Sequence, residues 1–207
     1  MNFDQITLKN GLRIIGERIP HFRSVSVGFW VGSGSQYETP DEAGLSHFLE
    51  HMVFKGTEKR TTRQIAEEMD KVGGQLNAFT SKECTCFYAK VVDEHLPLAM
   101  DVLSDLVTAP IFDPAELEKE KGVVIEEINM SADDPEDSVH ELLMLANYGD
   151  QPVARPILGT EEKIAAYSSE DLRAYWKKMY RPQNTVLALA GNYDWNAVVA
   201  LAEKLLD

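Results

Sequence analysis

The sequence predicts an α+β fold, with an antiparallel or mixed sheet and helices packed mainly on one face. Of the 207 residues, 44% are hydrophobic, which is enough for a buried core. Polarity alternates over residues 4–8 and 12–17 around Asn10-Gly11, the strongest short-range signal for a β-hairpin. The strands and helices that follow lack the strict βαβ alternation of a parallel sheet. These observations favour a sheet that opens with a hairpin.

Four further strands are expected after the hairpin, and turn residues separate them. Ser81-Lys82 forms a short turn between the second and third of these strands. Gly32 and Gly34 end the first of them, and we interpret this pair as a flexible turn because the third glycine of a dinucleotide-binding fingerprint is missing. The predicted ranges are 24–31, 75–80, 83–92 and 184–190.

Helix boundaries are marked by capping residues. Asp41 and Glu42 indicate the first turn of a helix that continues to Val53, and Lys55-Gly56 ends it. Thr61-Thr62 caps a second helix, which runs to Val72 and stops at a glycine pair. Asp–Pro pairs and a Ser168/Asp171 capping box start three of the later helices. The later predicted helices span 94–108, 113–130, 135–148, 168–180 and 194–206, and 149–160 is irregular.

The charge of the chain argues against a nucleic-acid partner. It carries 34 acidic and 20 basic residues, a formal net charge of −14, and no basic stripe. An acidic surface attracts basic peptides, but it also serves solubility, and both interpretations stay open. The first residues are not a signal peptide, and no 18-residue apolar run spans a membrane. Cys84 and Cys86 lie too close along a strand for an unstrained disulfide, so we expect reduced thiols and a cytoplasmic protein.

The segment His47-Phe48-Leu49-Glu50-His51 is the main functional signal. On a helix, His47 and His51 are four residues apart and share one face with Glu50. Imidazoles are preferred zinc ligands, and a carboxylate beside the metal can take a proton from an activated water. The order His-x-x-Glu-His reverses the commoner metalloprotease motif and is the inverzincin signature. The competing interpretation is two core-facing histidines bonded to the backbone.

A zinc site needs a third protein ligand, and the acidic helix 113–130 offers candidates. Glu120 and Glu127 are seven residues apart and share a helical face, whereas Glu126 points about 100° away from Glu127. The same helix carries many other charged residues, so spacing alone favours a surface residue over a ligand for Glu127.

Several stretches together resemble the M16 family of metallopeptidases (pitrilysins or inverzincins), which includes mitochondrial processing peptidase and insulin-degrading enzyme. They are GLSHFLEHMVFKGT, GVVIEEINM, NGLRI, GSGSQYE, GGQLNAFTSKECTCFYAKV, DDPEDSV and PILGT. The resemblance covers essentially the whole chain and is closest to short bacterial processing-peptidase-like members. It implies a single M16-type catalytic domain over residues 1–207, equivalent to the N-terminal half of a family member.

The resemblance assigns a role to particular residues. It implies that His47, His51 and Glu127 bind zinc and that Glu50 is the general base. Glu120 matches the glutamate that orients a ligand or tunes the metal from behind it. Asn77 and Ala78 fall in the strand that pairs with an extended substrate peptide. On sequence alone, a turn-capping role for Asn77 is equally open.

Together these features predict a zinc-dependent endopeptidase domain that acts on peptides or unfolded polypeptides. Zinc would polarise the scissile carbonyl, and Glu50 would move the proton from water to the leaving amine. Family members normally contain a second, homologous half that completes the substrate site. We therefore expect that half to be joined in a longer protein or supplied by a partner subunit, possibly in a dimer. The alternatives are a non-catalytic binding or assembly subunit and a structural zinc site closed by a fourth ligand.

Overall fold

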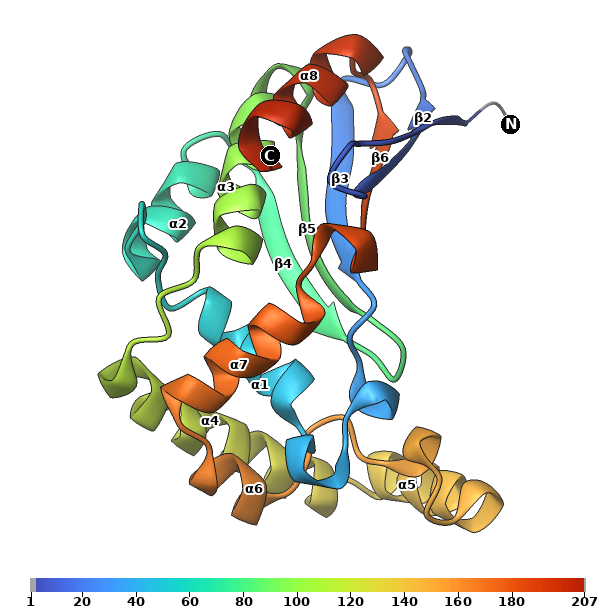
Figure 1. The fold of residues 1–207 in the computed structure, drawn as a ribbon, viewed down its shortest axis with the longest axis vertical. Coiled ribbons are helices and arrows are strands. Elements are labelled where there is room, and N and C mark those ends of the chain that lie inside the picture. The colour runs from blue at the N-terminus through green and yellow to red at the C-terminus, as the bar shows by residue number, and fades with distance from the viewer. Residues whose placement is uncertain (1–2, 207) are drawn as a thin grey trace.

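The computed structural model describes residues 3–206, and its centre is a six-stranded mixed sheet (Figure 1). The strand order is β1-β2-β6-β3-β5-β4, so the last strand of the chain lies between the second and the third. Only the β2–β6 pair is parallel; the other neighbours are antiparallel. The predicted α+β class with a mixed sheet is confirmed.

The strands are β1 (Asp4–Thr7), β2 (Arg13–Arg18), β3 (Ser24–Val31), β4 (Gln75–Thr80), β5 (Thr85–Val92) and β6 (Thr185–Gly191). The helices are α1 (Leu45–Val53), α2 (Thr62–Asp70), α3 (Leu96–Thr108), α4 (Pro114–Asp133), α5 (Pro135–Tyr148), α6 (Glu161–Ala166), α7 (Ser169–Met179) and α8 (Trp195–Leu206). The hairpin around Asn10-Gly11 forms as predicted, with Gly11 at φ +94° in its turn.

Several element boundaries differ from the sequence prediction, and one helix was not predicted. Asp41 and Glu42 belong to a separate 3-10 turn, because Gly44 adopts a left-handed conformation (φ +85°) and α1 begins only at Leu45. The short helix α6 was not predicted, since six residues are too few to show an amphipathic period. Strand β5 starts at Thr85 and not at residue 83, because Ser81 accepts backbone hydrogen bonds from Glu83 and Cys84 in the preceding turn.

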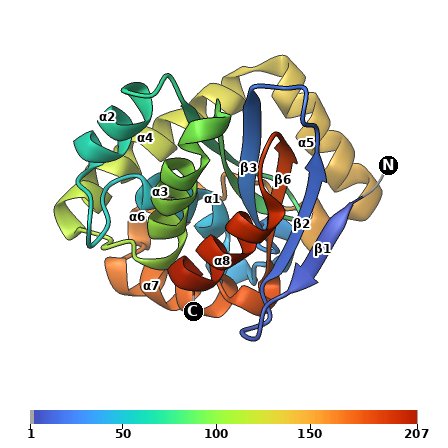
Figure 2. The ribbon, with the colours of Figure 1, turned by 90° about the horizontal axis from the view of Figure 1, so that it is seen from above.

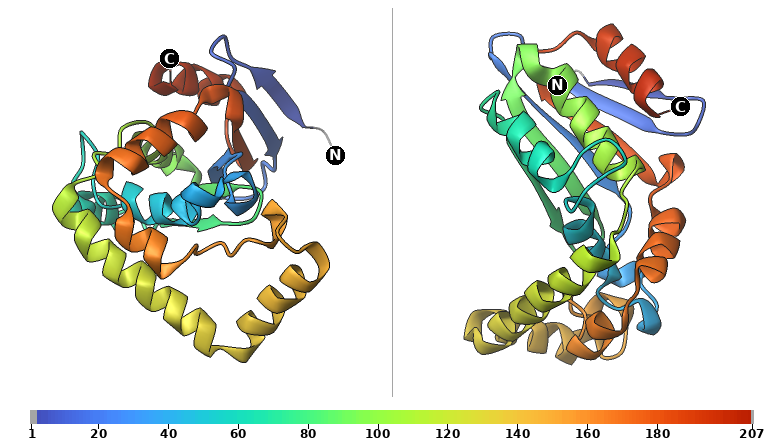
Figure 3. Two further views of the ribbon diagram at one scale, coloured as in Figure 1. Left: turned by 60° about the horizontal axis from the view of Figure 1, so that its bottom comes forward. Right: turned by 90° about the vertical axis from the view of Figure 1, so that its left-hand side faces the viewer.

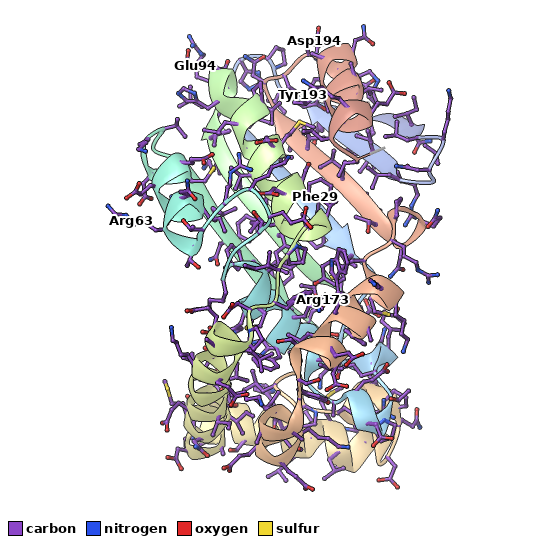
Figure 4. The ribbon with its side chains drawn as sticks, turned by 60° about the vertical axis from the view of Figure 1, so that its left-hand side comes forward. Phe29, Arg63, Glu94, Arg173, Tyr193 and Asp194 are labelled. Atoms are coloured by element: carbon purple, nitrogen blue, oxygen red, sulfur yellow. The ribbon has the colours of Figure 1, made fainter. Side chains whose placement is uncertain are left out.

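Helices cover one face of the sheet, where the main core lies. Helix α3 packs on β3 and β5, with α2 and α8 beside it (Figure 2). Phe29 of β3 is 1% exposed and lies between the sheet and these helices, whereas Arg63 of α2 extends outward (Figure 4). Helices α4 and α5 form a V beyond one end of the sheet, and residues 149–160 run back along its open side (Figure 3). The site described below lies where α1 and α4 meet near that end.

Part of the opposite face of the sheet is apolar and carries exposed aromatic side chains. Trp30, Phe79 and Tyr88 are 41%, 40% and 36% exposed, and the Trp30 and Phe79 rings meet edge to face at 5.6 Å. Ala188 and Gly28 line the same shallow depression. An antiparallel sheet that faces water normally presents polar residues on that side. This surface, which we call the aromatic sheet face, therefore has the composition of a surface that becomes covered.

Within residues 3–206, no helix is both long and apolar enough to cross a membrane. Both cysteines are free thiols. Burial raises the pKa of the Cys86 thiol to about 12, so it stays protonated near neutral pH.

Candidate metal centre

The atoms that could bind a metal come from two helices that cross. Helix α1 carries His47 and His51 on one side. Helix α4 carries Glu127, which lies two turns after Glu120. The His47 and His51 Nε2 atoms are 3.2 Å apart. Glu127 Oε2 lies 3.7 Å from His47 Nε2 and 3.4 Å from His51 Nε2. All three predicted ligands thus converge on one point.

These spacings fit a zinc ion. With bonds of about 2.0–2.2 Å in a tetrahedral site, two ligand atoms lie roughly 3.3–3.6 Å apart. The donor atoms of the three residues all lie within 4.8 Å of one another, and they form the one such cluster among residues 3–206. Two imidazoles and one carboxylate are also a donor set that zinc accepts. Three protein ligands leave one coordination position open to water or substrate, as in catalytic and not structural sites.

The protonation of His47 favours metal binding. Burial, together with the charge of the neighbouring His51, lowers the pKa of His47 to about 4. The imidazole is therefore neutral at physiological pH, which is the form that binds a metal. Its buried Nδ1 atom has no hydrogen-bond partner among residues 3–206.

Glu120 supports His51 from behind. It is 6% exposed, and its Oε1 atom lies 3.0 Å from His51 Nδ1. Since a carboxylate only accepts, His51 donates through Nδ1–H and leaves the Nε2 lone pair for the metal. The other oxygen of Glu120 pairs with Lys55 Nζ at 2.6 Å. Lys55, Glu120 and His51 thus form a chain that fixes the orientation of one ligand.

Replacing Glu120 with glutamine is expected to weaken zinc binding by roughly 10- to 100-fold, because such supporting groups fix the ligand ring and its tautomer. Competition with a chromophoric chelator measures the dissociation constant. The control is Glu118→Gln, since Glu118 lies on the same helix, is exposed and pairs only with Lys121. Equal affinities for the two variants would show that Glu120 does not support the site.

Glu50 lies beside the ligands and is held by the edge strand. Thr80 of β4 donates a hydrogen bond from Oγ1 to Glu50 Oε2 at 2.5 Å. Burial raises the pKa of Glu50 above its usual value, although the bond from Thr80 and the charge of His51 oppose this. A carboxylate with a raised pKa is a better proton acceptor near neutral pH. The position of Glu50 suits a general base.

An open groove of about 700 Å³ is lined by Glu50 and by two of the proposed ligands, His47 and Glu127. The edge strand β4 forms one wall, and α5 with Ile157 and Leu158 forms others. Five carboxylates and one lysine face it: Glu50, Glu127, Asp134, Asp137, Glu141 and Lys82. The groove is therefore strongly acidic.

The predicted substrate-binding residues lie on the edge of the sheet. Asn77 and Ala78 belong to β4, which pairs with β5 on one side and is last in the strand order. Ala78 lines the groove, whereas the Asn77 side chain accepts a bond from the Ala78 backbone N–H. Substrate binding by these two residues stays a prediction.

Sequence reasoning missed two residues that contact the site, Lys55 and Thr80. Lys55 lies four residues after His51, just beyond the end of α1, and the sequence pattern marks it only as part of a helix stop. Thr80 lies within a stretch that carried the family resemblance. The contacts of Lys55 with Glu120 and of Thr80 with Glu50 join different elements, so the local pattern does not show them.

A reversed His-x-x-Glu-His helix and a glutamate from a second helix, set beside a mixed α+β sheet, define the class of inverted zinc-peptidase folds. The chain belongs to the insulinase family, peptidase family M16, whose model matches residues 13–161. A second model, that of the M16 inactive domain, matches residues 166–207.

Curated relatives are described as uncharacterized zinc proteases. One from Bacillus subtilis is 53% identical over 186 residues, which is 90% of this chain and 46% of the relative. One from Streptomyces coelicolor is 45% identical over 193 residues, which is 93% of this chain and 42% of the relative. The chain therefore spans about half the length of the curated relatives that it matches.

Solved structures share the fold over the whole chain. A protease from Helicobacter pylori superposes with a TM-score of 0.94 at 22% identity, covering 99% of this chain and 50% of that one. An M16-like peptidase from Alicyclobacillus acidocaldarius gives 0.88 at 27% identity, covering 99% and 49%. An M16 inactive domain from Pseudomonas fluorescens gives 0.91 at 18% identity, covering 99% and 50%. The family resemblance noted in the sequence is confirmed.

Proposed function

We propose that this chain is the zinc-binding half of an endopeptidase that hydrolyses extended peptides. The observation that carries the proposal is the convergence of His47, His51 and Glu127 beside the unliganded carboxylate of Glu50. The relatives' description as zinc proteases supports the same metal and the same class of reaction.

In the proposed mechanism, a bound zinc ion would supply Lewis acidity toward a carbonyl group and a water molecule. His47 and His51 would hold the ion through Nε2, and Glu127 would add a carboxylate oxygen. Glu50 accepts the proton of the attacking water and delivers it to the leaving amine. The hydroxyl of Thr80 keeps the Glu50 carboxylate on the side of the groove. No covalent intermediate with the protein is needed.

The substrate is proposed to lie along β4 as an added strand. The outer edge of β4 offers backbone groups to an extended peptide, and Ala78 places that edge beside the metal centre. The acidic lining of the groove favours basic side chains near the scissile bond. We therefore infer that the substrates are extended peptides with at least one basic residue.

A homologous second half is the proposed partner. Relatives are about twice the length of this chain, and an M16 inactive domain shares its fold. Two apolar surfaces fit such a partner: the aromatic sheet face and helix α5, whose Val139, Leu142 and Leu143 are 56%, 63% and 56% exposed. Surfaces of this composition are typical of stable interfaces between domains. Phe79 of the first surface and residues of α5 also line the groove, so a partner bound to these surfaces would lie beside it.

The experiment is cleavage of an unstructured basic peptide by this chain, alone and with a homologous second half, before and after chelation. We expect turnover that needs zinc and increases when the second half is present. A neutral peptide of the same length tests the acidic groove and is expected to be cleaved more slowly. Absence of turnover with zinc bound, in every combination, would contradict the proposal.

That negative outcome would favour a non-catalytic assembly subunit of the same fold. The intact set of His47, Glu50, His51 and Glu127 argues against this alternative, because a subunit without chemistry has no need for a base beside the ligands. A cytoplasmic location stays a prediction that rests on the cysteines.

A further inference from the structure

Two sequence motifs that the metal centre does not explain meet at the start of the metal-binding helix α1. They are GSGSQYE at residues 32–38 and PILGT at residues 156–160. Neither contributes a ligand or the base. Both contact the turn that contains Gly44, directly before α1.

The first motif ends in Glu38, which is buried and accepts two backbone hydrogen bonds. Its side-chain oxygens lie 2.8 Å from Gly44 N and 2.7 Å from Ser46 N, and the residue is 3% exposed. Gly44 is the N-cap of α1 and Ser46 lies in its first turn, so neither N–H group has a partner within the helix. Ser46 directly precedes His47, so the bonds act on the backbone beside a ligand.

The second motif fits against the same turn through glycine. A Cβ atom on Gly44 would lie 2.7 Å from the Leu158 carbonyl oxygen, and one on Gly159 would lie 2.6 Å from the Ala43 carbonyl oxygen. Gly44 and Gly159 also have positive φ angles of +85° and +75°. The two backbones can touch only because both positions are glycine. The same segment contributes Ile157 and Leu158 to the groove wall.

Further bonds hold Glu38 and Ser46 in place. Arg155, just before the second motif, donates a side-chain hydrogen bond to the Glu38 carbonyl oxygen. The Ser46 hydroxyl lies 2.9 Å from the Tyr175 hydroxyl of α7 and 3.2 Å from that of Ser33. The start of α1 is therefore held by contacts from three other parts of the chain.

We propose that Glu38 is a positioning residue that sets the orientation of α1 and thereby aims His47 and His51 at Glu127. Helix α1 has only nine residues, too few to hold its conformation without outside contacts. A metal site tolerates displacements of roughly 0.5 Å and 10–20°. A small rotation of α1 would therefore separate the imidazoles from the carboxylate on α4. The inference rests on the proposed function in taking zinc as the ion.

The test is Glu38→Gln. A glutamine side chain has only one oxygen that can accept a hydrogen bond, whereas two backbone N–H groups need an acceptor. Its NH2 group, itself a donor, would then face the second backbone N–H. We expect zinc to bind about 10-fold more weakly or worse, the range seen when groups behind a ligand are removed. Chelator competition is measured at a temperature at which both metal-free proteins are folded. Two further readouts are the visible absorption of bound Co²⁺, expected to change, and amide exchange at Gly44 and Ser46 without metal, expected to accelerate.

Glu42→Gln is the matched control, because it removes the same charge four residues along the chain. Among residues 3–206, the hydrogen-bond partners of the Glu42 carboxylate are Thr39 and Lys178, neither of which lies in α1. We expect its zinc affinity and cobalt spectrum to match those of the original protein. If Glu38→Gln also matches, and only its melting temperature falls, Glu38 is merely a stabilising cap and the inference is wrong.

Failure of this inference differs from failure of the proposed function. If the original chain does not bind zinc, the proposed function fails, while amide exchange still tests Glu38. If Glu38→Gln does not fold, Arg155→Ala replaces it: the carboxylate stays, but its backbone loses support. The same changes are then expected in smaller degree, and unchanged affinity and exchange in that variant would overturn the inference.

Discussion

Replacing Glu50 with glutamine is expected to reduce kcat/KM for peptide cleavage by about 10²- to 10⁴-fold, the usual contribution of a general base. Glutamine keeps the size of the side chain and can still meet the Thr80 hydroxyl, but it cannot accept the proton of the attacking water. Because Glu50 is not among the three converging ligands, zinc affinity should change little. The assay compares Glu50→Gln with the original chain in the presence of the homologous second half.

The matched control for this prediction is Glu126→Gln. Glu126 is exposed and precedes the ligand Glu127, but it is not part of the metal-binding cluster. We expect its activity to equal that of the original protein. If Glu50→Gln keeps more than a tenth of the activity while its zinc content is unchanged, Glu50 is not the base.

Replacing Arg60 with methionine is expected to lower the free energy of unfolding by roughly 3–5 kcal/mol, the cost of leaving a buried charge without its partner. Arg60 follows the metal helix and bonds three carboxylates: Glu68 at Nε (3.0 Å), Asp105 at Nη1 (3.0 Å), and Asp101. Asp105 is 3% exposed and would be left with only the Thr57 hydroxyl at 2.6 Å. Urea denaturation of the metal-free protein measures the change.

Arg63→Met is the control for this second prediction. Arg63 lies on the same stretch, but its side chain is 86% exposed and pairs only with Glu67 on the helix surface. Its loss should cost less than about 1 kcal/mol. A double variant, Arg60→Met with Asp105→Asn, should recover part of the lost stability, because the uncompensated charge is gone. A loss below 1 kcal/mol for Arg60→Met alone would contradict the account of this network.

The residues of the metal helix could be predicted from the sequence because their relation is local. His47, Glu50 and His51 are related by the geometry of one helical turn, which any helix reproduces. For the third ligand, the sequence spacing left two candidates, because Glu120 and Glu127 share one helical face. Only the family resemblance distinguished the ligand from the supporting residue. Their contacts with His51 depend on how α4 crosses α1, which is a tertiary property.

The groups that support the site could not be derived from local patterns. Glu38 and Thr80 act on α1 from a loop and from an edge strand, across sequence separations of 8 and 30 residues. The predicted start of α1 is wrong because Asp41 and Glu42 are typical of a first helical turn. Gly44 could have indicated a later start, since glycine is unfavourable inside a helix. The strand order could not be predicted from local sequence patterns either, because the position of β6 between β2 and β3 depends on long-range strand pairing.

The central claim is that His47, His51 and Glu127 hold one zinc ion with an open position. X-ray absorption spectroscopy of the purified, zinc-loaded chain, with metal analysis, tests this most directly. We expect one zinc per chain, coordinated by two imidazoles, one carboxylate and an exchangeable oxygen ligand from water. Four protein ligands around the ion, or zinc content that survives replacement of both histidines, would contradict the claim.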